Sequence, residues 1–132
     1  MALVKSHRFS RKPKEKTVRA LSAPGTKWRV MPMTATDETE LAKKFQEYDP
    51  RSKTYTIVDT IGHLKVQAIQ VIRGWEDLPG DESDAEGNPL PMPFSTAALE
   101  DLCEMATNTI AEVINESRRA DALVVEAAGK NS

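Results

Sequence analysis

Reactive side chains are scarce in this chain of 132 residues, which has a single cysteine, Cys103, and only two histidines, His7 and His63. One cysteine cannot form an internal disulfide, and a lone thiol fits a reducing compartment. Neither histidine has a second histidine or cysteine at the spacing of metal ligands. We therefore expect no catalytic residue, no metal site and no cofactor, and Cys103 is predicted to be a small buried hydrophobe.

Long apolar runs are also absent. No stretch approaches the 18 or so consecutive apolar residues that a membrane-spanning helix needs, and no apolar run follows the basic N-terminus as it would in a secretory signal. Hydrophobic residues make up 39% and aromatic residues 5% of the chain, which predicts a modest, mainly aliphatic core. We expect one intracellular, non-membrane domain, because domains of about 100–150 residues are the commonest.

Charge is unevenly distributed, although the formal net charge is only −2. Residues 1–20 contain seven Lys or Arg residues against one acid, Glu15, whereas no Lys or Arg occurs between Arg73 and Arg118. Residues 1–17 are poor in apolar side chains and predict a flexible basic arm. A solvated tail is the favoured interpretation of this arm, with contact to an acidic protein or to nucleic acid as alternatives.

The first half of the chain predicts strands followed by a helix. Residues 18–21 and 28–33 suggest a hairpin whose turn is the Ser-Ala-Pro-Gly segment at 22–25. Hydroxyl and carboxylate side chains at 34–38 mark a helix start, and Leu41, Phe45 and Tyr48 recur on one face. Asp49-Pro50 would end this helix, because a residue before proline disfavours the α conformation.

Residues 53–72 fit two interpretations. Apolar residues recur at helical spacing through this segment, which favours a helix from about 59 to 73; they are Ile57, Ile61, Leu64, Ala68, Val71 and Trp75. Tyr55 to Val58 is instead rich in strand formers, which leaves a pair of strands open.

The second half predicts a long loop and then helices. Residues 76–93 are acidic and proline-rich, as in an exposed loop. Ser95 would cap a helix that carries Leu99, Leu102 and Met105. A second helical run starts at about Asn108 and carries Ile110, Val113 and Ile114. This second helix could extend to residue 128, where Gly129 would end it. The predicted fold class is α+β: one helix-dominated domain over 18–128, with a short N-terminal β-hairpin, a C-terminal helical bundle and a tail at 129–132.

One stretch has a specific order of residues. Gly74-Trp75 is followed by acids, then by Gly87-Asn88-Pro89-Leu90-Pro91, and then by Phe94-Ser95 at the start of a helix. This order resembles the tail assembly chaperones of long-tailed phages, of the type that handles a tape-measure protein. The resemblance covers about residues 18–120, and its specific part is residues 72–95. Met92-Pro93 is an insertion relative to the family pattern, and the pattern does not require the basic arm.

The motif residues also have predicted structural roles. Trp75 would cap the core at the end of a helix, and Phe94 would pack on the first turn of the helix that Ser95 caps, as in a hydrophobic staple. Together these two rings would clamp both ends of the acidic loop. Gly74 would allow a tight turn behind Trp75.

The resemblance implies a client-binding function. Such chaperones coat the long helical tape-measure protein in the host cytoplasm, keep it soluble, and are not expected in the mature virion. The resemblance implies two further partners: a longer form of the same chain made by ribosomal frameshifting, which Gly129-Lys130 would suit, and the tail tube protein. Self-association is also compatible with the resemblance.

We predict that an amphipathic client helix would bind an apolar groove on the exposed side of the helices near 57–72 and 99–114. Val66, Ile69 and Ile72 are the predicted client-binding residues. Two other functions stay open: a structural virion component, such as a tail or head–tail connector protein, and a small nucleic-acid-binding regulator that uses the basic arm.

Overall fold

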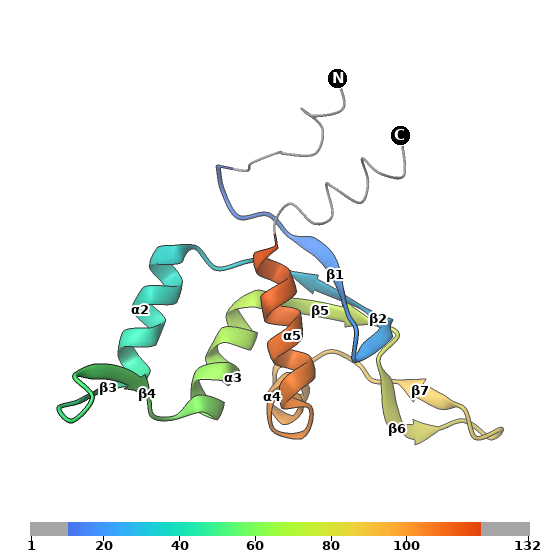
Figure 1. Cartoon of the computed structure of the whole chain (residues 1–132). Coiled ribbons are helices and arrows are strands. Elements are labelled where there is room, and N and C mark those ends of the chain that lie inside the picture. The colour runs from blue at the N-terminus through green and yellow to red at the C-terminus, as the bar shows by residue number, and fades with distance from the viewer. Residues whose placement is uncertain (1–10, 120–132) are drawn as a thin grey trace.

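The computed structural model describes residues 11–119 and shows a small domain that combines helices with short strands (Figure 1). The strands are β1 Lys16–Ala20, β2 Ala23–Val30, β3 Gln46–Asp49, β4 Thr54–Ile57, β5 Ile72–Glu76, β6 Pro79–Ser83 and β7 Pro89–Pro91. The helices are α2 Ala35–Phe45, α3 Thr60–Val71, α4 Thr96–Met105 and α5 Thr107–Arg118. The mixed class predicted from the sequence is thus observed. No helix in the described range is long and apolar enough to cross a membrane.

A three-stranded antiparallel sheet of order β1-β2-β5 forms the centre of the fold. Residues of β1 and β2 alternate between buried and exposed, as expected for a sheet that is covered on one face. Helix α5 contacts β1 and β2, and α3 contacts β5. The buried side chains of the sheet therefore face these helices, and this layer holds the core; they are Val18, Ala20, Trp28, Val30, Ile72 and Trp75.

The turn between β1 and β2 differs from the predicted one. It consists of Leu21 and Ser22, while Pro24 and Gly25 lie inside β2. The carboxylate of Glu112, on α5, accepts hydrogen bonds from the backbone N–H groups of Leu21 and Ser22 and from the Ser22 hydroxyl. The predicted position of the turn was wrong because these backbone donors bind to Glu112, a residue about 90 positions away. The local sequence pattern around the turn does not reveal such a distant partner.

Glu112 should make stability depend on pH. Desolvation opposes ionisation, but the hydrogen bonds from Leu21 and Ser22 prevail and hold the pKa of Glu112 below its usual range. A lowered folded-state pKa stabilises the fold above the unfolded pKa, and this contribution is lost as pH falls through the folded value. Glu112→Gln is therefore expected to lower the melting temperature at about pH 7 and to have less effect at about pH 3.

Melting curves of wild type and Glu112→Gln at both pH values check this prediction. Glu82→Gln, which removes a carboxylate from an exposed position, is the matched control and should leave the melting temperature nearly unchanged at either pH. An equal effect of Glu112→Gln at both pH values would contradict the role of the charged carboxylate.

Helix α2 begins where the sequence predicted. Thr34 is its N-cap, and Thr34 and Asp37 form a reciprocal capping box. The helix ends at Phe45 rather than at Tyr48, however, because residues 46–49 form β3 and pair with β4. Tyr48 is therefore not on the inner face of a helix: it is 52% exposed, and its ring lies 5.2 Å from that of Tyr55 on β4.

Both interpretations of residues 53–72 are partly correct. The helix is present as α3, capped by Asp59, whose carboxylate accepts the Gly62 N–H. The strand-rich residues before it form β4. Ile57 and Trp75 continue the helical spacing but lie on the strands that flank α3, so only its central residues, Leu64, Ala68 and Val71, are buried by the helix.

The predicted loop at 76–93 was wrong, since most of this segment is a third hairpin, β6–β7, after β1–β2 and β3–β4. Asp84 orders its turn: the Asp84 carboxylate accepts the N–H groups of Glu86 and Asn88, and its carbonyl accepts that of Gly87. Gly87 has a positive φ of 86°, which glycine adopts without steric cost. The backbone N–H of Asn88 is the main cause of a lowered pKa at Asp84.

Helices α4 and α5 pack against each other and against α3. Ser95 caps α4 as predicted, its hydroxyl accepting the Ala98 N–H at 3.0 Å. Leu99, Cys103, Ile110 and Val113 are buried, whereas Met105, which was grouped with Leu99 and Leu102 in the predicted helix, is 85% exposed. Because α5 also covers the sheet, the C-terminal helices form a layer over strands and not a separate bundle.

The chain ends lie largely outside the described residues. The basic arm was predicted to span 1–17, but Lys16 and Thr17 belong to β1. The predicted helical extension over 120–128, the stop at Gly129 and the tail at 129–132 all fall outside the described range.

Candidate client-binding surface

The motif residues predicted to clamp the acidic segment lie together at the base of the β6–β7 hairpin. Trp75 stands between two rings, with centroids 5.7 Å from Trp28 and 4.7 Å from Phe94, both in edge-to-face geometry. Its indole N–H donates to the Met92 carbonyl at 2.8 Å. Trp75 therefore lies on strand β5 and not, as was predicted, at the end of a helix. It does contact Phe94, so the two rings join the two ends of the acidic segment.

The prolines and Gly74 of the motif lie on strands. Pro91 pairs with Pro79 and Pro89 with Ser83 across the hairpin. Gly74 lies within β5, and its φ is not positive, so a tight turn is not the reason for glycine. A Cβ atom at 74 would instead meet the guanidinium of Arg29, the flexible end of a side chain, which would have to move aside.

The three predicted client-binding residues have different environments. Ile69 on α3 is 40% exposed and Val66 is half-buried. Ile72 is only 2% exposed and is paired with Val30 inside the sheet. Ile72 was therefore a wrong prediction: the helix ends at Val71, and the change to strand geometry turns this side chain into the core.

Ile69 lies at the edge of a hollow of about 320 Å³. We call it the methionine groove, because Met31 and Met33 contribute to its wall; Pro13, Pro32, Asp37, Ile69, Gln70 and Arg73 complete it. Methionine side chains are flexible and polarizable, so they adapt to apolar partners of different shape. The groove was missed from the sequence because residues 31–33 read as a strand end.

The chain after β2 is fixed in place along the groove. The Met31 N–H donates to the Val71 carbonyl at 2.8 Å, and Arg73 contacts the Met31 sulfur at 3.9 Å. Asp37 and Arg73 add one charge of each sign to the wall of the groove. Apolar side chains beside charges of both signs can bind the apolar face of a helix and set its direction.

A second hollow, of about 470 Å³, lies between the β1–β2 turn and the base of the β6–β7 hairpin. Three motif or turn prolines, Pro24, Pro89 and Pro91, line it together with Leu78 and Thr26. The Thr26 hydroxyl donates to the Asp77 carbonyl at 3.1 Å, which joins the two walls. Four of its ten lining residues are prolines, whose rings are less flexible than the methionine side chains of the methionine groove.

Cys103 and His63 lie in environments that shift their pKa values in opposite directions. Burial raises the pKa of the Cys103 thiol to about 11, which disfavours the nucleophilic thiolate. Partial burial, and then the positive charge of Arg118, lowers the pKa of His63, whose ring lies 5.5 Å from that of Phe45. Between residues 11 and 119, no three His, Cys, Asp or Glu side chains are grouped so that they could hold a metal ion.

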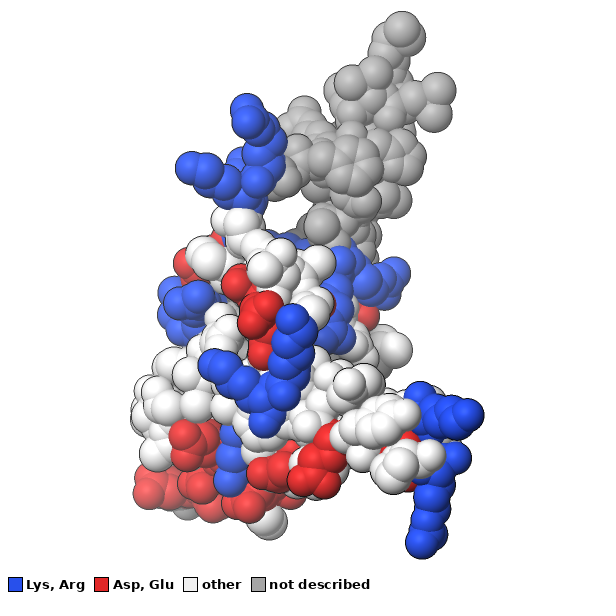
Figure 2. All heavy atoms as spheres, turned by 90° about the vertical axis from the view of Figure 1, so that its left-hand side faces the viewer, with Lys and Arg blue, Asp and Glu red and all other residues white. Residues whose placement is uncertain are grey.

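Charge is segregated on the surface. On the side that carries α2 and the β3–β4 hairpin, Figure 2 shows acidic side chains gathered along the lower edge and Lys and Arg side chains concentrated higher up and at one lower corner. The Arg118 guanidinium on α5 pairs with Glu38 on α2 at 2.6 Å.

Comparisons with protein-family models, with curated proteins and with solved structures found no match.

Proposed function

We propose that this protein is a tail assembly chaperone that binds a helical tape-measure protein and keeps it soluble during phage tail assembly. The observation that carries the proposal is the methionine groove, where Met31, Met33 and the exposed Ile69 offer an adaptable apolar surface next to fixed charges. The resemblance at residues 72–95 supplies the class of client. A long helical client exposes repeated amphipathic faces, and each face suits such a groove.

The arrangement of the groove supports binding without chemistry. Its walls contain two thioethers, two prolines and one aliphatic side chain, together with the polar Gln70 and the charged Asp37 and Arg73. Reversible coating of a client needs moderate affinity, which buried apolar area can supply at about 25 cal/mol per Å² before the costs of ordering are subtracted.

Ile69→Asp is expected to abolish the solubilising activity. A carboxylate at this position would be desolvated by an apolar client helix, and an unpaired buried charge costs several kcal/mol. Co-expression with the tape-measure protein, followed by separation of soluble and insoluble client, measures the effect. We expect wild-type chaperone to keep the client soluble and Ile69→Asp to leave it in the insoluble fraction.

Met105→Asp is the matched control. Met105 is also an exposed apolar residue on a helix, but it is not part of the groove wall. It should retain activity, and circular dichroism should show both variants folded. Equal client solubility with wild type and a folded Ile69→Asp would overturn the proposal, as would the recovery of this protein in fixed stoichiometry from purified virions.

A further inference from the structure

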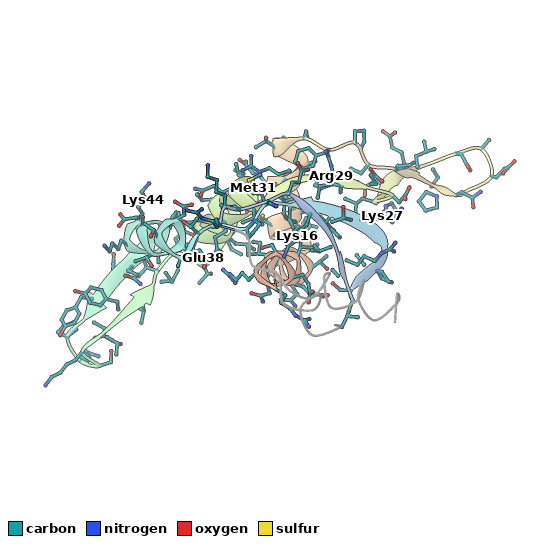
Figure 3. All side chains as sticks on the ribbon, turned by 90° about the horizontal axis from the view of Figure 1, so that it is seen from above. Lys16, Lys27, Arg29, Met31, Glu38 and Lys44 are labelled. Atoms are coloured by element: carbon teal, nitrogen blue, oxygen red, sulfur yellow. The ribbon has the colours of Figure 1, made fainter. Side chains whose placement is uncertain are left out.

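The face of the central sheet that points away from the helices is basic. Alternation along β1 and β2 directs Arg19, Lys27 and Arg29 opposite to the buried Val18, Trp28 and Val30. Arg73 is exposed on β5, at the irregularity in its pairing with β2. We call these four cationic side chains, Arg19, Lys27, Arg29 and Arg73, the basic face. Lys27 and Arg29 lie along β2 in Figure 3, where the molecule is seen from above.

The carboxylates near the basic face do not neutralise it. Glu15 pairs with Arg29 at 3.6 Å, but both side chains keep about half of their exposure. Glu76 is the strand neighbour of Lys27. The Arg19 guanidinium donates to the Pro24 carbonyl at 3.0 Å, which fixes its position and leaves its charge. Asp37 lines the methionine groove together with Arg73. Four cations thus lie near three acids, which leaves an excess of positive charge on this sheet surface.

Gly74 has no side chain, so it leaves room for the Arg29 side chain at the centre of the basic face. Arg29 and Gly74 are direct partners across β2 and β5, and the Arg29 guanidinium lies where a side chain at 74 would stand. The arginine is therefore laid across the sheet, with its planar group available to a carboxylate. Guanidinium groups bind carboxylates with two parallel hydrogen bonds, which favours an acidic partner of defined geometry.

The same chain carries a matching acidic element. Every residue from 81 to 90 is exposed, and the β6–β7 hairpin contains Asp81, Glu82, Asp84 and Glu86 with no Lys or Arg. Its turn is fixed by the hydrogen bonds to Asp84. An ordered hairpin loses little conformational entropy on binding, so its carboxylates are pre-organised for a cationic surface.

The acidic hairpin cannot neutralise the basic face of its own molecule. Figure 1 shows β6 and β7 extending outward from the end of β5, away from the sheet and helices. We propose that the acidic β6–β7 hairpin of one copy docks on the basic face of a second copy. Because the two surfaces differ, the contact is heterologous and repeats from copy to copy, closing into a ring or growing as a chain.

This contact does not require the methionine groove or any client. It does provide a way for successive copies to be spaced along a long client, since each copy presents one hairpin and one basic face. Electrostatic attraction dominates the proposed interface, so it should weaken as salt shortens the Debye length from about 10 Å at 0.1 M to about 3 Å at 1 M.

Analytical ultracentrifugation of the purified, nuclease-treated full chain tests the proposal. At low salt the average mass should rise above that of the monomer as concentration increases, and at about 1 M NaCl it should return to the monomer value. The face variant Arg19→Glu/Lys27→Glu and the hairpin variant Asp81→Lys/Glu82→Lys should each weaken self-association about tenfold or more. Both variants leave the groove wall intact.

Mixing the two variants separates a lost contact from misfolding. The reversed hairpin is complementary to the reversed face, so an equimolar mixture should associate more strongly than either variant alone. A wild-type chain that stays monomeric at low salt would overturn the proposal, and so would a mixture that does not associate. Retention of a DNA oligonucleotide by a monomeric wild type, lost in the face variant, would assign the basic face to nucleic acid instead.

Discussion

Trp75→Ala is expected to lower the free energy of unfolding by about 3–5 kcal/mol, the usual cost of removing a buried aromatic ring. The indole is 7% exposed, contacts Trp28 and Phe94 edge to face, and donates to the Met92 carbonyl. Its removal opens the sheet at β5 and releases the base of the β6–β7 hairpin. Since small domains have a net stability of only about 5–15 kcal/mol, this variant should be close to unfolding at room temperature.

Chemical denaturation followed by tryptophan fluorescence and circular dichroism measures this effect. Trp75→Phe keeps a ring between Trp28 and Phe94 but loses the hydrogen bond to Met92, so we expect a smaller loss of about 1–3 kcal/mol. Tyr55→Ala is the control for an aromatic pair outside the core, because Tyr55 is 66% exposed, and it should cost about 1 kcal/mol or less. Equal losses for Trp75→Ala and Tyr55→Ala would contradict the clamp.

Ile110→Ala should have the second largest effect, a loss of about 2–5 kcal/mol. Ile110 is completely buried on α5, the helix that contacts β1, β2, α3 and α4. A cavity here lies where sheet and helices meet, so neighbouring side chains on several elements lose contacts at once. The midpoint of urea denaturation checks the prediction.

Asn108→Ala supplies the comparison on the same helix. Asn108 is exposed, so its replacement should change stability by about 0.5 kcal/mol or less. If Ile110→Ala were no more destabilising than Asn108→Ala, α5 would not contribute to the core as described.

The parts of the fold that could be predicted from the sequence are those set by local contacts. Thr34 and Ser95 mark helix starts because their side chains bond to backbone N–H groups three residues later. The spacing of Leu64, Ala68 and Val71 identifies α3, since one helix face is buried against the core. Cys103 was predicted to be buried because a free cysteine usually behaves as a small hydrophobe, and it is buried.

The errors occur where distant residues decide the structure. The β1–β2 turn at Leu21-Ser22 depends on Glu112, and the β6–β7 hairpin depends on Trp75 holding the Met92 carbonyl. Prolines argued against strands at 79–91, yet Pro79 and Pro91 pair on a two-stranded hairpin, where a missing N–H is tolerated at an edge. Helical spacing continued through Ile57 and Trp75 because strands on both sides of α3 also bury apolar residues.

The residues of the candidate surface were also predicted correctly where local spacing decides their position, and wrongly or not at all where distant packing does. Ile69 was identified because it lies off the buried stripe of α3, whereas Ile72 was assigned to the same surface on the assumption that the helix continued. Met31 and Met33 come from a connection that residue type alone does not place beside Ile69. Only the packing of the segment after β2 against the end of α3 creates the groove.

Methyl NMR of methionine-labelled protein, titrated with a helical segment of the tape-measure protein, tests the groove most directly. The chain has five methionines, of which Met31 and Met33 line the groove and Met105 is 85% exposed elsewhere. We expect the methyl signals of Met31 and Met33 to shift with increasing client while that of Met105 stays in place. Client binding that shifts Met105 and leaves Met31 and Met33 unchanged would contradict the account.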